Sequence, residues 1–211
     1  MTEFLKYAIV IIIGYFLGNI SAGQWIGRWF GKTDIREHGS GNQGATNMLR
    51  TLGYLPSILT LLGDALKGAV AALIGMWLLG PYGARIGGLC AVVGRVFPVM
   101  YRFKGGRGIG TGLGVLLVTD PLVVLCLLII QVAVIAATKY MSVASLISPV
   151  LYFIAVLIIH NGQALPIALA ALLAAVLIYA HRDNISRLIA GKENKLDFSK
   201  YKMRHKIGKE G

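Results

Sequence analysis

The chain has 211 residues, of which 56% are hydrophobic and only 14% are charged. Soluble domains of this size are less apolar, so we predict a polytopic all-α membrane protein. The formal net charge of +12 would also suit nucleic-acid binding, but Lys and Arg gather in the polar loops and the C-terminal segment. That distribution is typical of cytoplasmic loops beside anionic lipid, so we expect the lipid bilayer, and no nucleic acid, as partner.

Six apolar blocks follow one another along the chain, near 4–27, 54–79, 82–101, 111–137, 142–160 and 163–181. Each approaches the roughly 20 residues that a helix needs to cross about 30 Å of hydrocarbon. The first block lacks a basic leader region and a small-residue cleavage site, so we expect it to remain in the mature protein. Cys90 and Cys126 lie in apolar runs and indicate neither a disulfide nor a metal site.

Basic residues in two distant regions set the expected orientation. Both the loop with Arg28, Lys32, Arg36 and Arg50 and the segment with Arg182, Arg187, Lys192 and Lys195 should be cytoplasmic. Six crossings would place these regions on opposite sides of the membrane. We divide the chain into a polytopic membrane domain, residues 1–191, and a basic cytoplasmic tail, residues 192–211.

The dipeptide Asp120-Pro121 lies inside the long fourth block and resolves this conflict. Proline ends or kinks a helix, and an aspartate at that point requires water or a cap. We therefore predict seven transmembrane segments, with the N-terminus outside and the C-terminus cytoplasmic. The piece before Asp120 has about 12 residues, or about 18 Å, and is either a short tilted span or a re-entrant helix.

The first polar loop contains the glycine-rich run GSGNQGATN at 39–47. Side chains of Ser40, Asn42, Thr46 and Asn47 can bind a phosphate or a hydroxyl group, and Arg36 and Arg50 add positive charge. The alternative is a glycine-rich turn before a helix capped by Thr46 or Asn47. Nine such residues in a row between two apolar blocks favour the anion site.

The second polar loop, 102–111, has three basic residues among four glycines and leads into an apolar helix. Backbone N–H groups of such a loop converge on anions, and so does a helix N-terminus. No Gly-Lys-Ser/Thr ends the loop, so nucleotide binding is not indicated. The alternative is a flexible cytoplasmic loop that is basic for topological reasons.

Three further groups of polar residues stand in or beside apolar helices. Asp64 and Lys67, at i and i+3, are either a structural pair or part of a polar cavity with Lys67 as anion ligand. Ser142 and Ser145 follow Lys139, where Ser142 alone would often be a helix N-cap. His181 opens a segment through Arg187 that can also be a simple juxtamembrane basic stretch.

Read in order, these motifs resemble those of the bacterial membrane glycerol-3-phosphate acyltransferases that use an acyl-phosphate donor, the PlsY family. The matching stretches are GSGNQGATNMLR (39–50), DALKG (64–68), FP (97–98) with FKGGRG (103–108), SVAS (142–145) and HRDNISRL (181–188) with Gly191 and Glu193. They span nearly the whole chain in the order of the family.

The resemblance implies acyl transfer from acyl phosphate to the sn-1 hydroxyl of glycerol 3-phosphate, which gives lysophosphatidate and phosphate for phospholipid synthesis. It also implies seven spans in the bacterial inner membrane, a cytoplasmic active site, no cofactor, and a soluble phosphate acyltransferase, PlsX, that supplies the acyl phosphate. Three positions depart from the family: Arg95 replaces a histidine that could shuttle a proton, Arg107 replaces a lysine, and Lys139 replaces an arginine.

We expect acyl phosphate at the 104–108 loop and glycerol 3-phosphate at Ser40, Asn42, Thr46, Asn47 and Arg50, closed by Lys67, Ser142 and His181. The expected catalytic residues are Lys104, Asn42, Arg50 and Ser142. The expected substrate-binding residues are Ser40, Gly41, Gly44, Thr46, Asn47, Lys67, Gly105, Gly106, Arg107, Gly108, Ser145, His181 and Asn184. No motif for a metal or a covalent nucleophile is found, so we expect catalysis by anion binding.

A membrane transporter or channel for phosphate or a small organic anion is the alternative function, because glycine-rich basic loops can also form a gate. That function predicts an internal repeat that relates the two halves of the chain. The two loops differ in motif, and the halves differ in their number of apolar segments.

Overall fold

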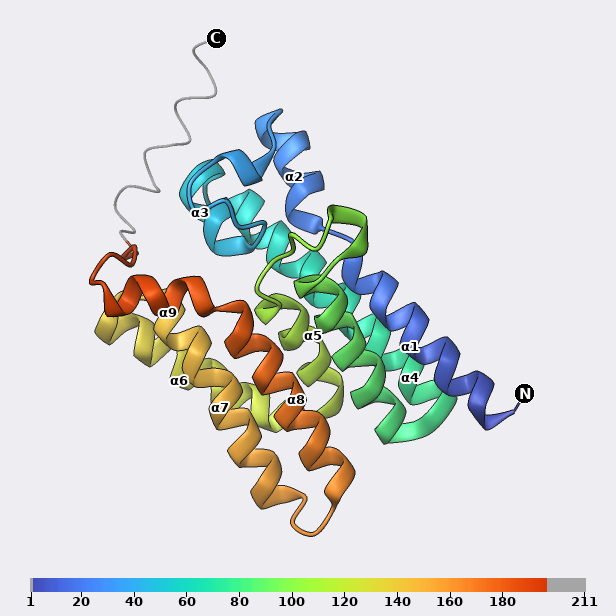
Figure 1. The fold of residues 1–211 in the computed structure, drawn as a ribbon. Helices are drawn as coiled ribbons and strands as arrows, with labels where there is room; N and C mark the ends of the chain where they lie inside the picture. Colours follow the sequence, from blue (N-terminus) through green and yellow to red (C-terminus); the bar gives the residue numbers. More distant parts are fainter. Residues whose placement is uncertain (1, 197–211) are drawn as a thin grey trace.

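The computed structural model describes residues 2–196, and within that range the chain is helical without β-strands. Its elements in chain order are α1 (Glu3–Asn19), α2 (Ala22–Gly31), η1 (Ile35–Glu37), α3 (Ala45–Leu52), α4 (Tyr54–Val96), η2 (Val99–Tyr101), α5 (Ile109–Thr119), α6 (Pro121–Thr138), α7 (Met141–Ile159), α8 (Ala164–Ala180) and α9 (Arg182–Ile189). Figure 1 shows the long helices side by side, with α2, α3 and α9 gathered at one end.

Helix α4 is a hairpin of two helical arms. Gly80 adopts φ 67° and ψ −157°, which is not helical, and Pro81 follows it. Beyond this point the chain folds back, so that the backbones of Gly75 and Gly83 touch and a Cβ on either would overlap the carbonyl oxygen of the other. The two apolar blocks that the sequence placed at 54–79 and 82–101 are therefore the two arms, and the second helix ends at Val96.

Helix α1 packs against α4 through small residues. A Cβ on Gly18 would overlap the carbonyl oxygen of Ala91, and one on Gly94 would overlap that of Tyr15. Such close approach of backbones is typical of helix pairs in membranes, where dispersion contacts replace the hydrophobic effect. It brings the C-terminal end of α1 against the second arm of α4, close to the polar loops.

The break expected at Asp120-Pro121 is confirmed, because α5 ends at Thr119 and α6 begins at Pro121. The buried carboxylate of Asp120 is neither capping a helix nor in water. Instead it accepts hydrogen bonds from Nη1 and Nη2 of Arg85, at 2.9 and 2.8 Å. This ion pair satisfies a charge that would otherwise be costly inside a membrane helix bundle.

Within the described residues, four helical stretches are long and apolar enough to cross a membrane, or five if α8 and α9, bent by 55°, count as one. One of the four contains the α4 hairpin, and α5, with 11 residues, is shorter than a full span, as expected. The predicted plan of seven segments counts α1, the two arms of α4, α5, α6, α7 and α8 separately.

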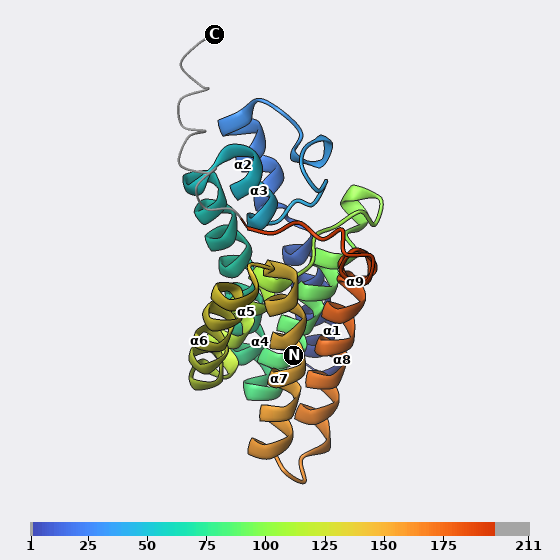
Figure 2. The ribbon, with the colours of Figure 1, turned by 90° about the vertical axis from the view of Figure 1, so that its left-hand side faces the viewer.

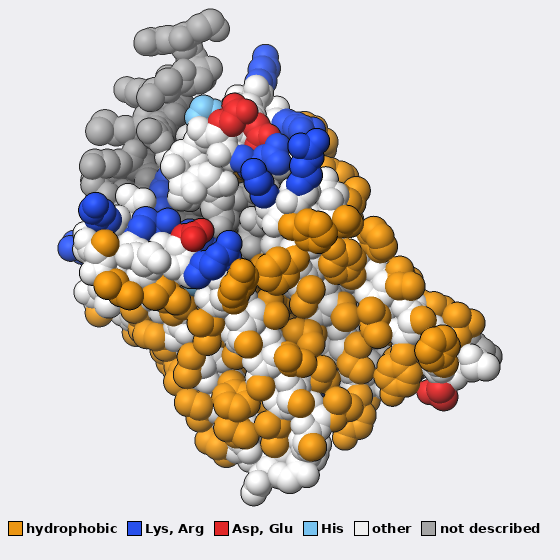
Figure 3. Space-filling view, viewed as in Figure 1, with side chains coloured by type: hydrophobic (Ala, Val, Ile, Leu, Met, Phe, Trp, Pro, Cys, Tyr) orange, Lys and Arg blue, Asp and Glu red, His pale blue; other side chains and the backbone are white. Residues whose placement is uncertain are grey.

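The polar loops lie at one end of the bundle. In Figures 1 and 2, the segment between α2 and α3, the loop before α5 and helix α9 are at the same end, and the α7–α8 turn is at the other. Figure 3 shows Lys and Arg side chains gathered at the loop end and hydrophobic side chains over the helices below. This separation is what a membrane protein with one basic face requires.

The first residues of the predicted tail contact the helical domain. Leu196 donates its N–H to the carbonyl of Lys139 at 2.8 Å, and Glu193 accepts hydrogen bonds from Asn184 and Arg187, each at 2.9 Å. The rest of the predicted tail, residues 197–211, lies outside the described residues.

Two glycines of α5 offer a matched test of this packing. A Cβ on Gly114 would overlap the carbonyl oxygen of Ala65, whereas a Cβ on Gly112 would meet its nearest neighbour, Leu177, at 3.9 Å. Gly114→Ala should therefore destabilise the protein by about 1–3 kcal/mol, the usual range for overpacking. Gly112→Ala should leave stability unchanged or raise it, since alanine is the better helix former. Thermal unfolding in detergent compares the two, and equal melting temperatures would contradict this packing.

Candidate active site

A cavity with about 1160 Å³ of open space lies at the polar end of the bundle. Most of its polar wall comes from four segments that are distant in the sequence, namely the loop before α3, the loop before α5, the start of α7 and the end of α8, and α4 and α6 add one polar residue each. The polar and glycine residues of this wall are Ser40, Asn42, Gly44, Thr46, Asn47, Ser57, Arg107, Gly108, Gly110, Gln131, Ser142, Ser145 and His181. The structure thus brings residues of four of the sequence motifs into one site.

The loop before α3 is shaped by the side chain of Asn47. Its Oδ1 accepts the N–H of Ser40 at 2.8 Å, and its Nδ2 donates to the carbonyls of Ile35 and His38 at 3.3 and 3.0 Å. Gly39, with φ 62°, leaves no room for a Cβ beside Asn47. The buried Asn47 therefore holds the loop, although it also reaches the cavity wall.

Asn42 is differently placed, because its carbonyl oxygen accepts the N–H of Gly44 at 2.9 Å. The NH₂ group of Asn42 donates to no other described residue, so it is available to a ligand in the cavity. Helix α3 begins directly afterwards at Ala45, with Gly44 as N-cap and no side-chain cap. The alternative function of Thr46 or Asn47 as helix cap is therefore wrong, and the first turn of α3 lines the cavity together with Gly44.

Arg107 supplies positive charge to the opposite wall. It is half-buried, and within residues 2–196 its side chain has no hydrogen bond or ion pair. Burial, and next the charge of Arg187, lower the pKa of Arg107 to about 10, so the guanidinium is still cationic at neutral pH. Gly108, with φ 78°, is the N-cap of α5, whose N-terminus also lines the cavity. An unpaired cation beside a helix N-terminus is a strong anion site.

His181 and Ser142 complete the wall with uncharged groups. The Nδ1 of His181 lies 2.8 Å from the carbonyl of Leu177, and because a carbonyl only accepts, this nitrogen carries the proton. A neutral ring then keeps Nε2 as a hydrogen-bond acceptor. The buried hydroxyl of Ser142 has no partner among the described residues. Both groups are thus available to a substrate in the cavity.

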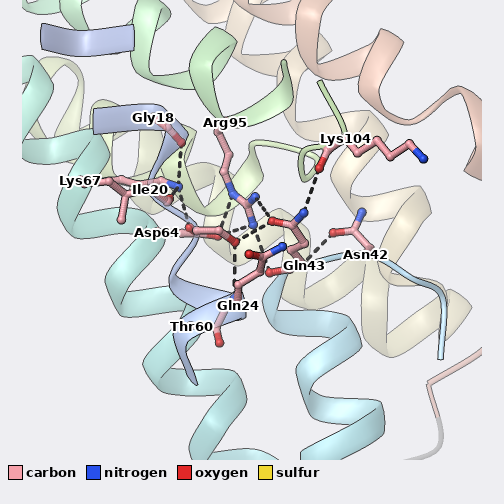
Figure 4. A network of polar contacts seen from close by, with 12 residues as sticks. Gly18, Ile20, Gln24, Asn42, Gln43, Thr60, Asp64, Lys67, Arg95 and Lys104 are labelled. Atoms are coloured by element: carbon pink, nitrogen blue, oxygen red, sulfur yellow. Dashed lines mark hydrogen bonds and ion pairs between the residues drawn. The ribbon is translucent and has the colours of Figure 1, made fainter. Parts of the chain in front are cut away.

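Behind this wall lies a buried network centred on Asp64 (Figure 4). Its carboxylate pairs with Nζ of Lys67 at 2.8 Å and with Nη2 of Arg95 at 3.2 Å. Lys67 also donates to the carbonyls of Gly18 and Ile20, at 3.2 and 2.6 Å. The predicted Asp64–Lys67 pair is confirmed, and three acceptors at the end of α1 and on α4 occupy the ammonium group of Lys67.

Arg95 links the network to both polar loops. Its Nη2 donates to the carbonyl of Gln43 at 3.0 Å, in the first loop. Its own carbonyl accepts the N–H of Gly106 at 3.0 Å, and a Cβ on Gly106 would stand 2.6 Å from the guanidinium carbon. Gln43 in turn donates to the carbonyl of Lys104 at 2.9 Å, which ties the loops together directly. The buried Arg95 therefore joins the Asp64 network to both polar loops.

Seven of the predicted site residues do not line the cavity: Gly41, Arg50, Lys67, Lys104, Gly105, Gly106 and Asn184. Lys104 is exposed, and its side chain extends away from the Arg95 network (Figure 4). Arg50 donates to the carbonyl of Asn194 at 3.1 Å, and Asn184 donates to Glu193. These residues surround the site at the level of the loops.

Sequence reasoning missed three polar contributors. Gln43 lies inside the glycine-rich run, yet no pattern marked it as the group that joins the two loops. Ser57 and Gln131 line the cavity from apolar blocks, where a single polar residue carries little signal. For these three residues, the only available indication in the sequence was the isolated amide of Gln131 in an apolar run.

Comparison with known proteins identifies the relatives of this chain. A family profile described as glycerol-3-phosphate acyltransferase matches residues 8–191. Proteins named glycerol-3-phosphate acyltransferase are 42% identical in Thermoanaerobacter pseudethanolicus, covering 90% of this chain and 96% of the relative, and 43% identical in Finegoldia magna, covering 91% and 98%.

Two crystal structures of PlsY, an integral membrane glycerol 3-phosphate acyltransferase, share the fold at 33% identity. The glycerol 3-phosphate form matches with a TM-score of 0.86 over 93% of this chain and 98% of the other. The form with lysophosphatidic acid matches with a TM-score of 0.82 over 90% and 95%.

Arg107 provides a test of the anion site. Arg107→Gln should weaken the binding of glycerol 3-phosphate or inorganic phosphate about tenfold to hundredfold, because a hydrogen bond to a charged group contributes about 1.5–3 kcal/mol. Stability should not fall, since the substitution breaks no ion pair within the described residues. Titration calorimetry in detergent measures the affinity, with Arg28→Gln, at an exposed cation on α2, as the matched control. Wild-type affinity in Arg107→Gln would refute this site.

Proposed function

We propose that this chain, which belongs to the glycerol-3-phosphate acyltransferase family and is an acyltransferase, takes its acyl group from an acyl phosphate and transfers it to the sn-1 hydroxyl of glycerol 3-phosphate. The products are lysophosphatidate and inorganic phosphate. The observation that carries this proposal is the cavity, whose two walls each offer an anion site, one before α3 and one before α5. Two sites suit two phosphorylated substrates.

Both substrates are dianions near neutral pH, so their approach requires compensating positive charge. We assign acyl phosphate to Arg107 and the N-terminus of α5, where the leaving phosphate gains stabilising hydrogen bonds as its C–O bond breaks. We assign glycerol 3-phosphate to Ser40, Asn42 and the N-terminus of α3. Lys104, one of the four catalytic residues expected from the sequence, is exposed at the loop end and is proposed to close over the bound phosphate.

Direct attack is the proposed chemistry. The sn-1 hydroxyl of glycerol 3-phosphate adds to the acyl carbonyl, the C–O bond to phosphate breaks, and the hydroxyl proton passes to a phosphate oxygen, whose pKa lies near 6. Ser142, with its unpaired hydroxyl, and His181, with its free Nε2, are placed to orient the substrates. Ser145 and Thr46 contribute further hydroxyl groups to the same wall.

The remaining residues that we predicted are proposed to position the site. Lys67 and Arg95 hold the buried carboxylate, Gly105 and Gly106 pack on Arg95, and Asn184 holds Glu193. Arg50, whose guanidinium contacts Asn194, is proposed to reach a phosphate at the rim. These assignments keep the predicted residues in one functional unit but give several of them an indirect role.

We also propose the membrane arrangement that the sequence predicted: seven segments in the bacterial inner membrane, an external N-terminus, and a cytoplasmic active site. The basic residues at the loop end of the bundle support this orientation. A soluble phosphate acyltransferase of the PlsX type would then deliver acyl phosphate from the cytoplasm.

The donor is tested by phosphate release. Purified protein in detergent or liposomes should release inorganic phosphate from palmitoyl phosphate only when glycerol 3-phosphate is added, with one lysophosphatidate formed per phosphate. Activity with acyl-CoA but not with acyl phosphate would contradict the proposed donor. Uptake of glycerol 3-phosphate into liposomes without turnover would instead favour a transporter.

Substitutions at two cations of the loop before α5 distinguish a catalytic role of one side chain from a general effect of positive charge. Lys104→Ala should lower turnover at least about 100-fold, a usual cost for one lost electrostatic contact to the transition state. Arg102→Asn should retain most activity, because Arg102 is also exposed but lies farther from the glycines, and asparagine tolerates its φ of 53°. Steady-state kinetics of the two variants compares their turnover numbers.

A trapped acyl-enzyme intermediate would overturn the proposed direct attack.

A further inference from the structure

A second cavity lies beside the candidate active site in the apolar part of the bundle. It lies between α5, α6, α7 and α8, and its walls are almost wholly apolar. The two cavities share Ile109, Leu113, Leu128 and Gln131 in their walls, so they are adjacent. At this junction Gln131 donates to the hydroxyl of Ser148 at 3.3 Å, between α6 and α7.

The two cavities follow one another along α7. Ser142 and Ser145 line the first cavity, whereas Ser148, Pro149 and Tyr152 line the second. Ten residues separate Ser142 from Tyr152, which corresponds to about 15 Å at 1.5 Å per helical residue. A cavity of this shape and polarity fits a saturated hydrocarbon chain that extends away from the reacting carbonyl.

Tyr152 closes the far end of this cavity. Its side chain is buried, and its hydroxyl donates to Oδ2 of Asp120 at 3.0 Å and accepts from Nη1 of Arg85 at 3.0 Å. The Arg85–Asp120 ion pair stands behind the ring, and Nη2 of Arg85 also lies 3.0 Å from Nε2 of His160. The ring is therefore held in one place by charged groups from two other segments.

A third, smaller cavity lies on the other side of the ring. Arg85, Leu89 and Thr119 contribute to its wall. Tyr152 and Leu173 line both this cavity and the second one. The tyrosine ring is thus a partition between an apolar cavity and a space beside a buried ion pair.

We propose that Tyr152 sets the length of the acyl chain that the protein accepts. This inference rests on the proposed function, since it takes the occupant of the second cavity to be the chain of an acyl phosphate. A chain that fills the cavity buries all its methylene groups against apolar walls. A longer chain meets the ring, and it can advance only by displacing a tyrosine whose hydroxyl would then leave Asp120 and Arg85.

Removal of the ring provides the first test. Tyr152→Ala joins the second and third cavities, so the ratio of kcat/KM for stearoyl phosphate to that for lauroyl phosphate should rise about tenfold or more. That is the scale on which a hydrophobic pocket distinguishes chain lengths. Tyr152→Phe keeps the ring, and Asp120 keeps both bonds from Arg85, so this variant should preserve the wild-type order of lauroyl, palmitoyl and stearoyl phosphate.

A second substitution should act in the opposite direction. Gly112 lines the second cavity beside Leu113, one of the residues shared with the first cavity, and a Cβ there meets only Leu177 at 3.9 Å. Gly112→Val should fold and should shift preference about tenfold toward lauroyl phosphate by reducing the space in the cavity. Ile158→Ala, on the outer face of α7 with 73% exposure, is the control for changes on that helix.

The outcomes separate the two proposals. If Tyr152→Ala and Gly112→Val are both active and both keep the wild-type order of acyl-chain preference, the role of Tyr152 is overturned and the proposed function stands. If Tyr152→Ala does not fold, an unchanged order of preference in Gly112→Val is enough to overturn the role of Tyr152. Wild-type protein that turns over none of the three acyl phosphates overturns the proposed function, and the role of Tyr152 with it.

Discussion

The buried carboxylate of Asp64 is the interaction on which the site depends. It lies between Lys67 on the same arm of α4 and Arg95 on the other arm. A buried charge without partners would be costly, so each of these contacts is needed once the others are present. Lys67 also bonds to the end of α1, and Arg95 also bonds to both polar loops, so these segments are held in place relative to Asp64. One carboxylate thereby fixes a hairpin, a helix end and two loops.

This arrangement explains why the two glycine-rich loops can act together. Catalysis by anion binding requires donors that are already in place when charge moves, because reorganising them would cost energy during the reaction. Gln43 connects the loops through the carbonyl of Lys104, and Gly106 lies against the guanidinium of Arg95 where no larger residue fits. The proposed anion sites before α3 and α5 are therefore held at a fixed separation by a network that need not touch a substrate.

The sequence predicted local features well and distant contacts poorly. Asp64 and Lys67 are one helical turn apart, and Asp120-Pro121 is a helix break by itself, so periodicity and proline chemistry suffice to predict them. Arg95 meets Asp64 only because α4 folds back at Gly80, and Arg85 meets Asp120 across 35 positions. No local pattern contains that information. For the same reason the sequence treated Lys67 as a free ligand, although acceptors at the end of α1 occupy it.

The two buried ion clusters occur toward opposite ends of the bundle, and the apolar second cavity lies between them. Inside a membrane, charged side chains must be paired or must line a polar cavity. A cluster in which every charge is paired can therefore stand at the end of an apolar cavity. At the loop end, the Asp64 cluster leaves Arg107 without a carboxylate partner among the described residues, and an anion site results. At the other end, Asp120 is fully engaged by Arg85 and Tyr152, and the space simply ends there. The two ends therefore differ: the cavity at the loop end is lined by Arg107, which has no ion pair among the described residues, whereas Arg85 at the other end is paired with Asp120.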